Sequence, residues 1–198
     1  MSANGKNVKL DQTVYYAFSG GQESDTGSIS GIPVVNAVKQ GDKESIIDIE
    51  YELEKEPYFK VGDTVTVTID SERRKKLRNL HSASHILYYF LADKIGEVKI
   101  MGSHIGEKKA RIDFKYEKSI SNIIPEIEQE VNDFLKENHM IIMNENASKT
   151  NLRWWSCNNW KIPCGGTHPK STKEIGKVKL KRKNIGSQKE RIEIYLVQ

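Results

Sequence analysis

The chain has 198 residues, of which 37% are hydrophobic and 29% are charged, proportions that exclude a disordered protein. No apolar run approaches the roughly 20 residues that span a bilayer, and the polar start lacks the apolar core of a signal peptide. We therefore expect a cytoplasmic protein without membrane association, and the two cysteines, Cys157 and Cys164, indicate free thiols and not a disulfide scaffold.

The formal net charge of +4 is unevenly distributed along the chain. The segment 161–198 contains ten Lys or Arg against three Glu, a net charge of +7, so the remainder of the chain sums to −3. A basic end suits a partner with a phosphate backbone, and we predict contacts to such a polyanion from Lys181, Arg182 and Lys183. The alternative is a lysine-rich surface that only keeps the protein in solution.

The first 70 residues favour short β-strands. Val65, Val67 and Ile69 alternate with threonines, which is the period of a half-buried strand. The ranges 34–38 and 45–51 are interpreted as further strands, and six glycines mark the turns between them. Several short strands with regular breaks predict a small β-barrel.

A long helix is predicted from Ser71, the expected N-cap, to about Ala92, with Gly96 as its stop. Apolar side chains recur on this helix at steps of three and four residues, which gives it one buried stripe. The stripe includes Leu77, Leu80, Leu87 and Leu91.

The rest of the chain alternates strands with a second helix. That helix is expected over about Ser121 to Asn138, where Pro125 is tolerated in the first turn. Strands are expected over the ranges 98–104, 110–116, 139–144, 177–182 and 191–197. The predicted fold class is α+β, with an N-terminal β-barrel domain at 1–70 and an α/β domain at 71–198 whose long helix packs on an antiparallel sheet.

Two pairs of potential metal ligands lie far apart in the sequence. His81 and His85 are four residues apart on the predicted helix, so both imidazoles lie on one face and can share an ion. Cys164 and His168 flank two glycines and a threonine, and glycine permits the tight turn that a chelating loop needs. Each pair alone is a weak signal, but one cysteine with three histidines is a reasonable zinc set.

The number of ligands leaves the role of such a zinc ion open. Four protein ligands usually form a closed structural site, whereas catalytic zinc usually keeps a position for water. Catalysis would therefore require a fifth ligand, a displaced ligand, or zinc that anchors the substrate beside the reacting bond. The alternative is an ion that only stabilises the fold.

Five further motifs accompany the two ligand pairs: Leu-Asp-Gln-Thr-Val-Tyr-Tyr at 10–16, Gly-Gly-Gln-Glu-Ser-Asp-Thr-Gly at 20–27, Gly-Ser-His at 102–104, Arg-Ile-Asp-Phe at 111–114 and Lys-Glu-Ile-Gly at 173–176. Together these motifs resemble the editing domain of alanyl-tRNA synthetases and its free-standing relatives, the AlaX family. The editing domain of threonyl-tRNA synthetase shares the ligand pattern. Ser19 and Glu23 depart from the family, which often has Gly and Pro there.

The resemblance implies the medium-length AlaX type, with a Gly-Gly-Gln loop in 1–70 and a zinc-binding deacylase domain in 71–198. Zinc would be held by His81, His85, Cys164 and His168. The implied reaction is hydrolysis, in trans and without ATP, of the ester in Ser-tRNA(Ala), at the acceptor end of tRNA(Ala). No catalytic residue beyond the zinc site is identified.

Five residues are candidates to line the substrate pocket and select serine over alanine: Ser82, Ser103, Gln22, Gly20 and Gly21. Trp154, Trp155 and Trp160 could stack on unpaired bases, with core packing as the alternative. Two other functions remain open, a tRNA-binding module with structural zinc and a threonyl-type editing module acting on another tRNA. A release-factor role for the Gly-Gly-Gln tripeptide is disfavoured because acidic residues, and not basic ones, follow it.

Overall fold

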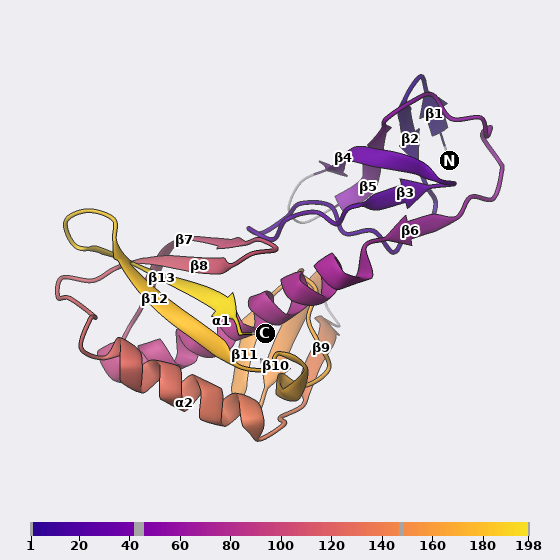
Figure 1. Ribbon diagram of the computed structural model, residues 1–198. Helices are drawn as coiled ribbons and strands as arrows, with labels where there is room; N and C mark the ends of the chain where they lie inside the picture. Colours follow the sequence, from indigo (N-terminus) through magenta and orange to yellow (C-terminus); the bar gives the residue numbers. More distant parts are fainter. Residues whose placement is uncertain (1, 42–45, 147–148, 198) are drawn as a thin grey trace. The chain divides into compact units, whose positions relative to one another are not determined.

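The computed structural model describes residues 2–41, 46–146 and 149–197 (Figure 1). The chain divides into two compact units. The first unit contains Met1–Ser19 and Glu23–Arg74, and the second contains Gly20–Gln22 and Lys75–Gln198. The tripeptide Gly20-Gly21-Gln22 thus leaves the first unit and belongs to the second.

The first unit is built on one antiparallel sheet in the order β1-β2-β5-β4-β3-β6. The apolar alternation of its strands buries a core that includes Tyr15, Tyr51 and Leu53. Residue 45 of the expected strand 45–51 lies outside the described residues. The strands are β1 (Ser2–Asn4), β2 (Asn7–Lys9), β3 (Gly27–Ile29), β4 (Ile32–Gly41), β5 (Ile46–Leu53) and β6 (Val67–Ile69).

The β-barrel expected from the sequence is not confirmed, because the sheet does not close within the described residues. Its edge strands, β1 and β6, each pair with one neighbour only. Each of these edge strands has three residues. Closure requires strands that tilt and stagger in register with one another, and hydrophobic alternation within single strands does not specify that.

Buried Asp25 holds together the chain on either side of the tripeptide. Its carboxylate accepts from the backbone N–H of Tyr16 at 2.7 Å and from Nε of Arg74 at 2.7 Å. The backbone N–H of Asp25 in turn donates to the carbonyl of Tyr16 at 2.9 Å. The acidic residue of the glycine-rich motif is therefore structural, since it ties the loop to the first turn of the long helix.

The long helix α1 spans Ser71–Ile95. Its N-cap is Asp70 and not Ser71, because the Asp70 carboxylate accepts from the backbone N–H of Arg73 at 2.9 Å. A carboxylate satisfies an orphan N–H and also interacts favourably with the positive end of the helix dipole. At the other end Gly96 adopts φ +80 and ends the helix, as expected.

The second unit is α+β. A four-stranded antiparallel sheet in the order β12-β13-β8-β7 lies against α1 and the second helix, α2 (Ile124–Lys136), and a three-stranded antiparallel sheet has the order β11-β10-β9 (Figure 1). Helix α2 begins later than expected, since residues 121–123 form a turn before Pro125. The strands are β7 (Lys99–Ile105), β8 (Ala110–Lys115), β9 (Ile141–Asn146), β10 (Lys149–Cys157), β11 (Trp160–Pro163), β12 (Val178–Asn184) and β13 (Lys189–Leu196), and a short 3-10 helix covers Thr172–Glu174.

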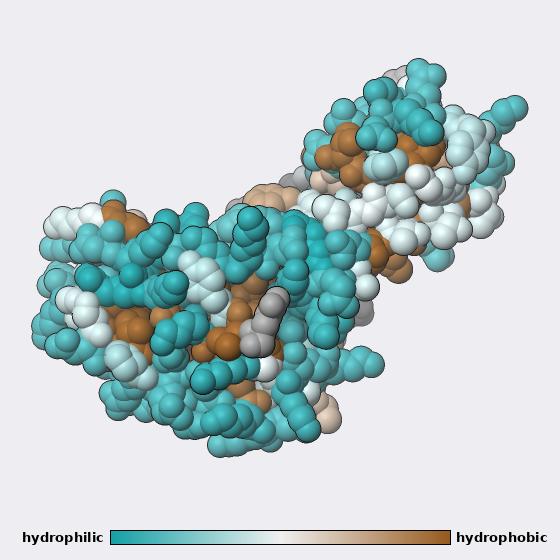
Figure 2. All heavy atoms as spheres, viewed as in Figure 1, coloured by the Kyte–Doolittle hydropathy of each residue, from teal (hydrophilic) through white to brown (hydrophobic). Residues whose placement is uncertain are grey.

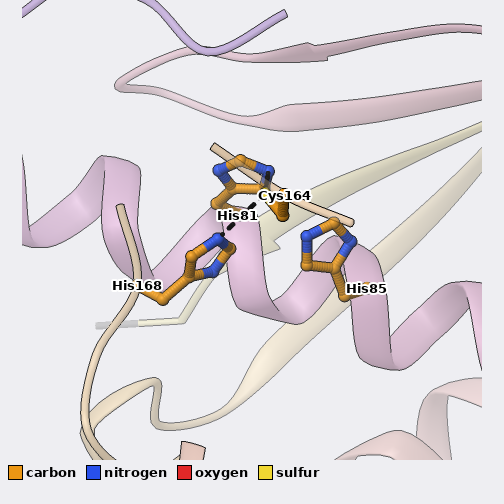
Figure 3. A group of neighbouring side chains, drawn as sticks. All are labelled: His81, His85, Cys164 and His168. Atoms are coloured by element: carbon orange, nitrogen blue, oxygen red, sulfur yellow. Dashed lines mark hydrogen bonds between the residues drawn. The ribbon is translucent and has the colours of Figure 1, made fainter. Parts of the chain in front are cut away.

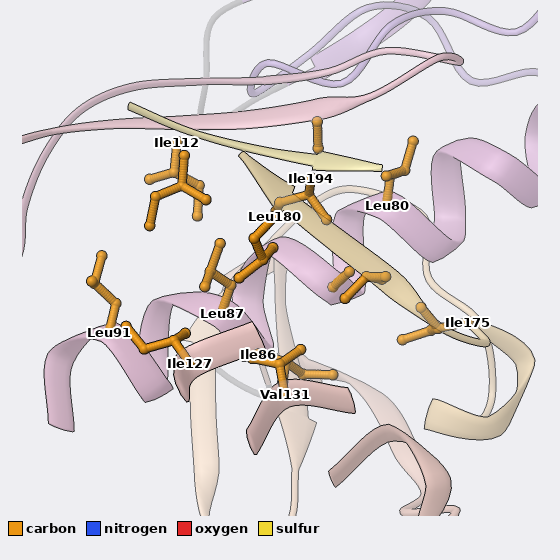
Figure 4. Close-up of a cluster of buried hydrophobic side chains, with 14 of the residues drawn as sticks. Leu80, Ile86, Leu87, Leu91, Ile112, Ile127, Val131, Ile175, Leu180 and Ile194 are labelled. Carbon is orange, nitrogen blue, oxygen red and sulfur yellow. The ribbon is translucent and has the colours of Figure 1, made fainter. Parts of the chain in front are cut away.

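The core of this unit fixes the position of α1. Leu80 and Leu87 of α1 pack with Ile127 and Val131 of α2 and with the inward side chains of the four-stranded sheet, such as Ile194 (Figure 4). On another side α1 contacts the three-stranded sheet, where the rings of Tyr89 and Trp160 stack with centroids 4.9 Å apart. Helix α1 is therefore held by both sheets, which suits a helix that must present side chains at fixed positions.

The side of the four-stranded sheet away from the helices carries charged residues. Strand alternation places Ile192 and Ile194 in the core and Glu193 on the opposite face. Glu193 is only 1% exposed, because it is covered by its partners: Nζ of Lys109 at 2.5 Å, the hydroxyl of Tyr195 at 2.8 Å and Nζ of Lys183 at 3.4 Å.

In the described part of the chain, neither α1 nor α2 has the length and apolar character that a bilayer-spanning helix requires.

We expect Glu193→Gln to lower the free energy of unfolding at pH 7 and to lose this effect in acid. Burial by itself raises the pKa of Glu193, but hydrogen bonds from Lys109 and Tyr195 outweigh it and lower the pKa to about 2. A depressed folded-state pKa stabilises the protein above the unfolded-state value of about 4.3, and this contribution disappears as the pH falls towards 2.

Urea unfolding of both proteins at pH 7, 5 and 3 measures the effect, and the difference should shrink at pH 3. Glu117→Gln is the control, because Glu117 is exposed in the loop between β8 and α2. A destabilisation that is the same at every pH would contradict the assignment of the effect to the charge.

Candidate metal centre

Three imidazoles and one thiol converge in the second unit. Helix α1 carries His81 and His85, and the loop after β11 carries Cys164 and His168 (Figure 3). One potential ligand atom from each of the four residues lies within 4.8 Å of the others. The thiol Sγ of Cys164 is 3.5 Å from Nε2 of His81 and 3.2 Å from Nε2 of His168.

The loop that carries Cys164 is held in place by Arg153 of β10. The guanidinium of Arg153 donates from Nη2 to the carbonyl of Gly165 at 2.6 Å and to that of Gly166 at 3.3 Å. The backbone N–H of Cys164 donates to the carbonyl of Arg153 at 2.9 Å. Further along, Nε of Arg78 donates to the carbonyl of His168 at 2.8 Å, which ties the end of the loop to α1.

Burial keeps the three imidazoles neutral near pH 7. It lowers the pKa of His81 and of His168 well below the usual value, and it lowers the pKa of His85 to about 4. The same burial raises the pKa of the Cys164 thiol, against a lowering by the backbone N–H of Gly166 and the charge of Arg153. Neutral imidazoles offer lone pairs, and a bound cation would favour the thiolate.

The four residues fit a metal ion. A tetrahedral site with Zn–N and Zn–S bonds of about 2.0–2.3 Å separates neighbouring ligand atoms by roughly 3.3–3.8 Å, close to the two distances from Cys164 Sγ. In addition, Nε2 of His85 is the one buried side-chain N or O atom in the described part of the chain that lacks a hydrogen-bond partner. A bound cation would satisfy this lone pair, and the cluster can therefore hold a metal ion.

A cavity of about 390 Å³ opens beside the cluster. His81 and His85 form part of its wall, and most of the remaining wall is apolar. The wall includes two serine hydroxyls, of which that of Ser84 donates to the carbonyl of Leu80 at 2.8 Å and that of Ser103 belongs to an exposed residue. The apolar wall consists of Tyr88, Ile100, Ile105, Ile112, Ile162 and Pro163.

The five predicted substrate residues occupy three different places. Ser103 lies in the cavity wall, whereas Ser82 and Gln22 are fully buried behind the ligand group. The hydroxyl of Ser82 lies 2.8 Å from Nδ1 of His168 and accepts from Nε1 of Trp155 at 3.1 Å. Gly20 and Gly21 lie on the chain segment next to β7, where the backbone N–H of Ile105 donates to the Gly21 carbonyl at 2.8 Å.

The predicted tRNA contacts lie away from the cluster, on β12. This strand is one edge of the four-stranded sheet, and β7 with Ser103 is the other edge. Lys181 and Lys183 are exposed, and Nζ of Lys181 lies 4.9 Å above the ring of Tyr195. Arg182 points to the opposite face and forms two hydrogen bonds, of 2.6 and 2.7 Å, with the buried carboxylate of Glu190.

The three tryptophans divide between packing and surface. Trp155 is fully buried, with its ring centroid 5.0 Å from that of His85, and Trp160 stacks on Tyr89. Trp154 is half-buried, with Nζ of Lys161 4.7 Å from its ring centroid. Cys157 is buried at the end of β10 and is not in the ligand group.

Sequence reasoning missed two side chains that support the site. The sequence patterns assign no role to Arg153, and they include Thr167 only as part of the cysteine motif. Thr167 donates its backbone N–H to Oε1 of Gln22 at 3.0 Å, and its hydroxyl accepts from Nε2 of Gln22 at 2.8 Å. A threonine inside a ligand loop was the available signal, but its partner lies 145 residues away.

The chain is similar to two known protein families. The family "Threonyl and Alanyl tRNA synthetase second additional domain" matches residues 152–193, and the family "tRNA synthetases class II (A)" matches residues 1–73. The chain is 35% identical over 195 residues to the alanyl-tRNA editing protein AlaX-M of Pyrococcus horikoshii, which covers 96% of this chain and 86% of the relative.

Similarity extends to alanine–tRNA ligases, of which the chain spans about a fifth. The ligase of Acaryochloris marina is 32% identical over 192 residues, 87% of this chain and 22% of the ligase. The ligase of Campylobacter jejuni is 32% identical over 188 residues, 85% of this chain and 22% of the ligase.

We expect Gly166→Ala to disrupt the cluster and Gly165→Ala to leave it intact. A Cβ at Gly166 would lie 2.2 Å from Cε1 of His81 and 2.9 Å from Oε1 of Gln22, whereas a Cβ at Gly165 meets nothing within 4 Å. Overpacking of this kind costs roughly 1–3 kcal/mol of unfolding free energy. Chemical denaturation and the Zn²⁺ bound per chain after dialysis measure the two effects, and equal behaviour of the two variants would contradict the packing seen here.

Proposed function

The chain belongs to the family of alanyl-tRNA editing proteins, and on this premise we propose that it is a deacylase that acts in trans on mischarged tRNA(Ala). The observation that carries the proposal is the group of three imidazoles and one thiol beside a mostly apolar cavity, whose wall includes His81 and His85. Its substrate would be Ser-tRNA(Ala), bound through the acceptor end, and the cytoplasm is where this substrate arises. We also propose the domain roles that the sequence predicts: residues 71–198 form the deacylase domain, and residues 1–70 provide the Gly-Gly-Gln loop.

We propose that the metal is zinc, held by His81, His85, Cys164 and His168. Neutral imidazoles and a thiolate are ligands that zinc accepts at tetrahedral spacing. A zinc ion held there would supply a Lewis acid beside the reacting ester. Hydrolysis breaks the bond between the acyl carbon and the ribose oxygen and adds the elements of one water molecule, so no ATP is required.

The residues of the cavity would bind and select the aminoacyl group. Its isoleucine side chains would exclude water once an aminoacyl group fills the cavity, which would strengthen the electrostatic interactions inside. No carboxylate lies among the described residues that line the cavity, so a general base of that kind is not part of the proposal. The ring of Tyr88 and the proline at the end of β11 offer apolar surface for the terminal nucleoside.

Ser103 is the proposed contact for the seryl hydroxyl. It is an exposed hydroxyl in the cavity wall, whereas the hydroxyl of Ser84 already bonds to the helix backbone. Ser82 and Gln22, also considered as substrate contacts, have side chains engaged with His168, Trp155, Thr167 and His81. Gly20 and Gly21 would bring the tripeptide backbone close to β7 beside Ser103.

Lys181 and Lys183 are the proposed contacts to the tRNA backbone. They lie on a charged sheet face that carries two buried carboxylates, each with two cationic partners. Asp113 pairs with Arg111 and Arg191. Glu193 pairs with Lys109 and Lys183. Each cluster therefore keeps one excess positive charge, which favours a polyanion. In the view of Figure 2 the surface of this unit is mostly hydrophilic. Arg182, the third expected contact, is engaged by Glu190 on the other face.

We predict that the protein hydrolyses Ser-tRNA(Ala) faster than Ala-tRNA(Ala). The substrates differ by one hydroxyl, and a polar group left unpaired by alanine costs roughly 1–3 kcal/mol, or about 5- to 150-fold. Deacylation of Ser-tRNA(Ala), Ala-tRNA(Ala) and Ser-tRNA(Thr) by one preparation, which should hold about one zinc per chain, measures the preference. Cys164→Ala should abolish the activity with its zinc, and Ser103→Ala should narrow the Ser/Ala ratio while zinc content stays unchanged.

The assay separates this proposal from the two alternatives. Preference for Ser-tRNA(Thr) would indicate a threonyl-type editing protein, an alternative that the matched family includes by name. Binding of tRNA without hydrolysis of any ester, by protein that contains zinc, would indicate a binding module with a structural ion. Active protein without any metal would refute the proposed site.

We predict that Lys181→Ala and Lys183→Ala each weaken tRNA binding and lower the slope of log affinity against log salt concentration by about 0.9. Arg182→Ala should instead destabilise the fold, because it leaves the buried carboxylate of Glu190 without its partner. Filter binding over a salt series and urea unfolding distinguish these effects. Lys118→Ala, at an exposed lysine outside the sheet, is the control, and a slope change of the same size there would refute the assignment.

A further inference from the structure

The side chain of Gln22 contacts the ring of His81 at Nδ1, the nitrogen that does not face Cys164. The backbone of the tripeptide pairs with β7 through a parallel bridge between Gln22 and Ile105. Gly21 adopts φ +86, and a Cβ there would lie 2.8 Å from the carbonyl oxygen of Ser103, so only glycine allows this approach. The approach buries Gln22 completely.

The orientation of the Gln22 amide is determined by a backbone group. The N–H of Thr167 lies 3.0 Å from one end of the amide, and a backbone N–H can only donate, so this end is the oxygen Oε1. The other end, Nε2, then donates to the hydroxyl oxygen of Thr167 at 2.8 Å. Both ends of the amide are thus satisfied in one orientation only.

This orientation decides which nitrogen of His81 carries the proton. Nδ1 of His81 lies 2.8 Å from the same Oε1, and an amide oxygen can only accept. Nδ1 must therefore carry a hydrogen and donate it. A neutral imidazole with a hydrogen on Nδ1 has none on Nε2, and the Nε2 lone pair faces Sγ of Cys164 at 3.5 Å.

We propose that Gln22 is a positioning residue that fixes His81 as the Nδ1–H tautomer and so presents Nε2 as a ready ligand in the metal cluster. A hydrogen bond on the far nitrogen is the usual means of setting the tautomer and ring orientation of a metal-binding histidine. The role of Gln22 in ligand binding rests on the proposed function, whereas the tautomer itself holds for the metal-free protein.

The corresponding contact on His168 does not fix a tautomer in this way. Its Nδ1 lies 2.8 Å from the hydroxyl of Ser82, and a hydroxyl can donate or accept. The hydroxyl also accepts from Trp155, which leaves both directions possible for the bond to His168. Gln22 therefore sets the tautomer of His81, whereas the contact with Ser82 allows either tautomer of His168.

The wild-type protein provides the first test, through ¹⁵N chemical shifts of the His81 ring in metal-free protein. We expect a protonated Nδ1 and an unprotonated Nε2 at pH 7. A protonated Nε2 in the wild-type protein would overturn the proposal without any variant.

A matched pair of variants provides the second test. Gln22→Met keeps the length of the side chain and removes the acceptor, so His81 should lose its tautomer preference and Zn²⁺ affinity should fall about 10- to 100-fold in chelator competition. Gln22→Glu keeps an oxygen for His81 and Thr167 whether or not the carboxyl is protonated, so the Nδ1–H tautomer should persist and affinity should fall by less than about tenfold. Thr167→Val keeps the backbone N–H and should leave the tautomer unchanged.

Each outcome has a distinct meaning. If Gln22→Met retains the tautomer and the affinity, or if Gln22→Glu loses both to the same extent, Gln22 does not act as the acceptor and the proposal fails. If wild-type protein shows the expected tautomer but binds no Zn²⁺, the proposed metal site fails and the tautomer assignment stands. Melting temperatures of the variants show whether a loss of affinity merely reflects unfolding, and in that case the wild-type spectrum decides.

Discussion

The second unit brings four side chains that offer lone pairs, those of His81, His85, Cys164 and His168, close together in a mostly buried place. Buried imidazoles and a buried thiol cost free energy when their polar atoms remain unpaired, and Nε2 of His85 is in that condition. Such an arrangement persists only where the surrounding packing enforces it. Here α1 contributes two donors while being held between two sheets, and the strand that leads into the ligand loop belongs to one of these sheets.

Three of the four potential ligands are restrained by a group from another part of the chain. Arg153 holds the carbonyls of the Cys164 loop, Trp155 reaches His168 through Ser82, and Gln22 faces His81. These restraints need close backbone approaches, and the glycines supply them. A side chain at Gly21 would strike β7, and one at Gly166 would strike His81 itself. Gly21 and Gly166 are thus explained by the lack of space for a side chain at the site.

The four-stranded sheet separates two tasks by strand alternation. One face, with Ile192 and Ile194, forms the core that fixes α1 and therefore the ligand group. The other face carries Asp113 and Glu193, each of which holds two cations in place. Cations fixed in this way lose little conformational freedom when a polyanion binds, which supports a role for this face in contact with RNA.

The sequence by itself determined the features that depend on a few neighbouring residues. Helical spacing places His81 and His85 on one face of α1, strand alternation predicts most strands of the second unit, and the glycine after α1 ends it. The combined motifs indicated the family, which the comparison with the P. horikoshii protein confirms. The hairpin β10–β11 was missed although Asn158, at φ +52 in a two-residue turn, is a usual signal for it.

Tertiary structure alone decided which residues lie behind the ligands and which face the cavity. Ser82 and Gln22 were expected beside Ser103 in the pocket, yet both are buried against partners that lie 86 and 145 residues away in the chain. The open edge of the first sheet and the hydrogen bond from Arg182 to Glu190 were likewise decided by tertiary structure. The physical reason is that backbone periodicity is set by local sterics and local hydrogen bonds, whereas the partner of a buried polar group is set by how distant elements pack.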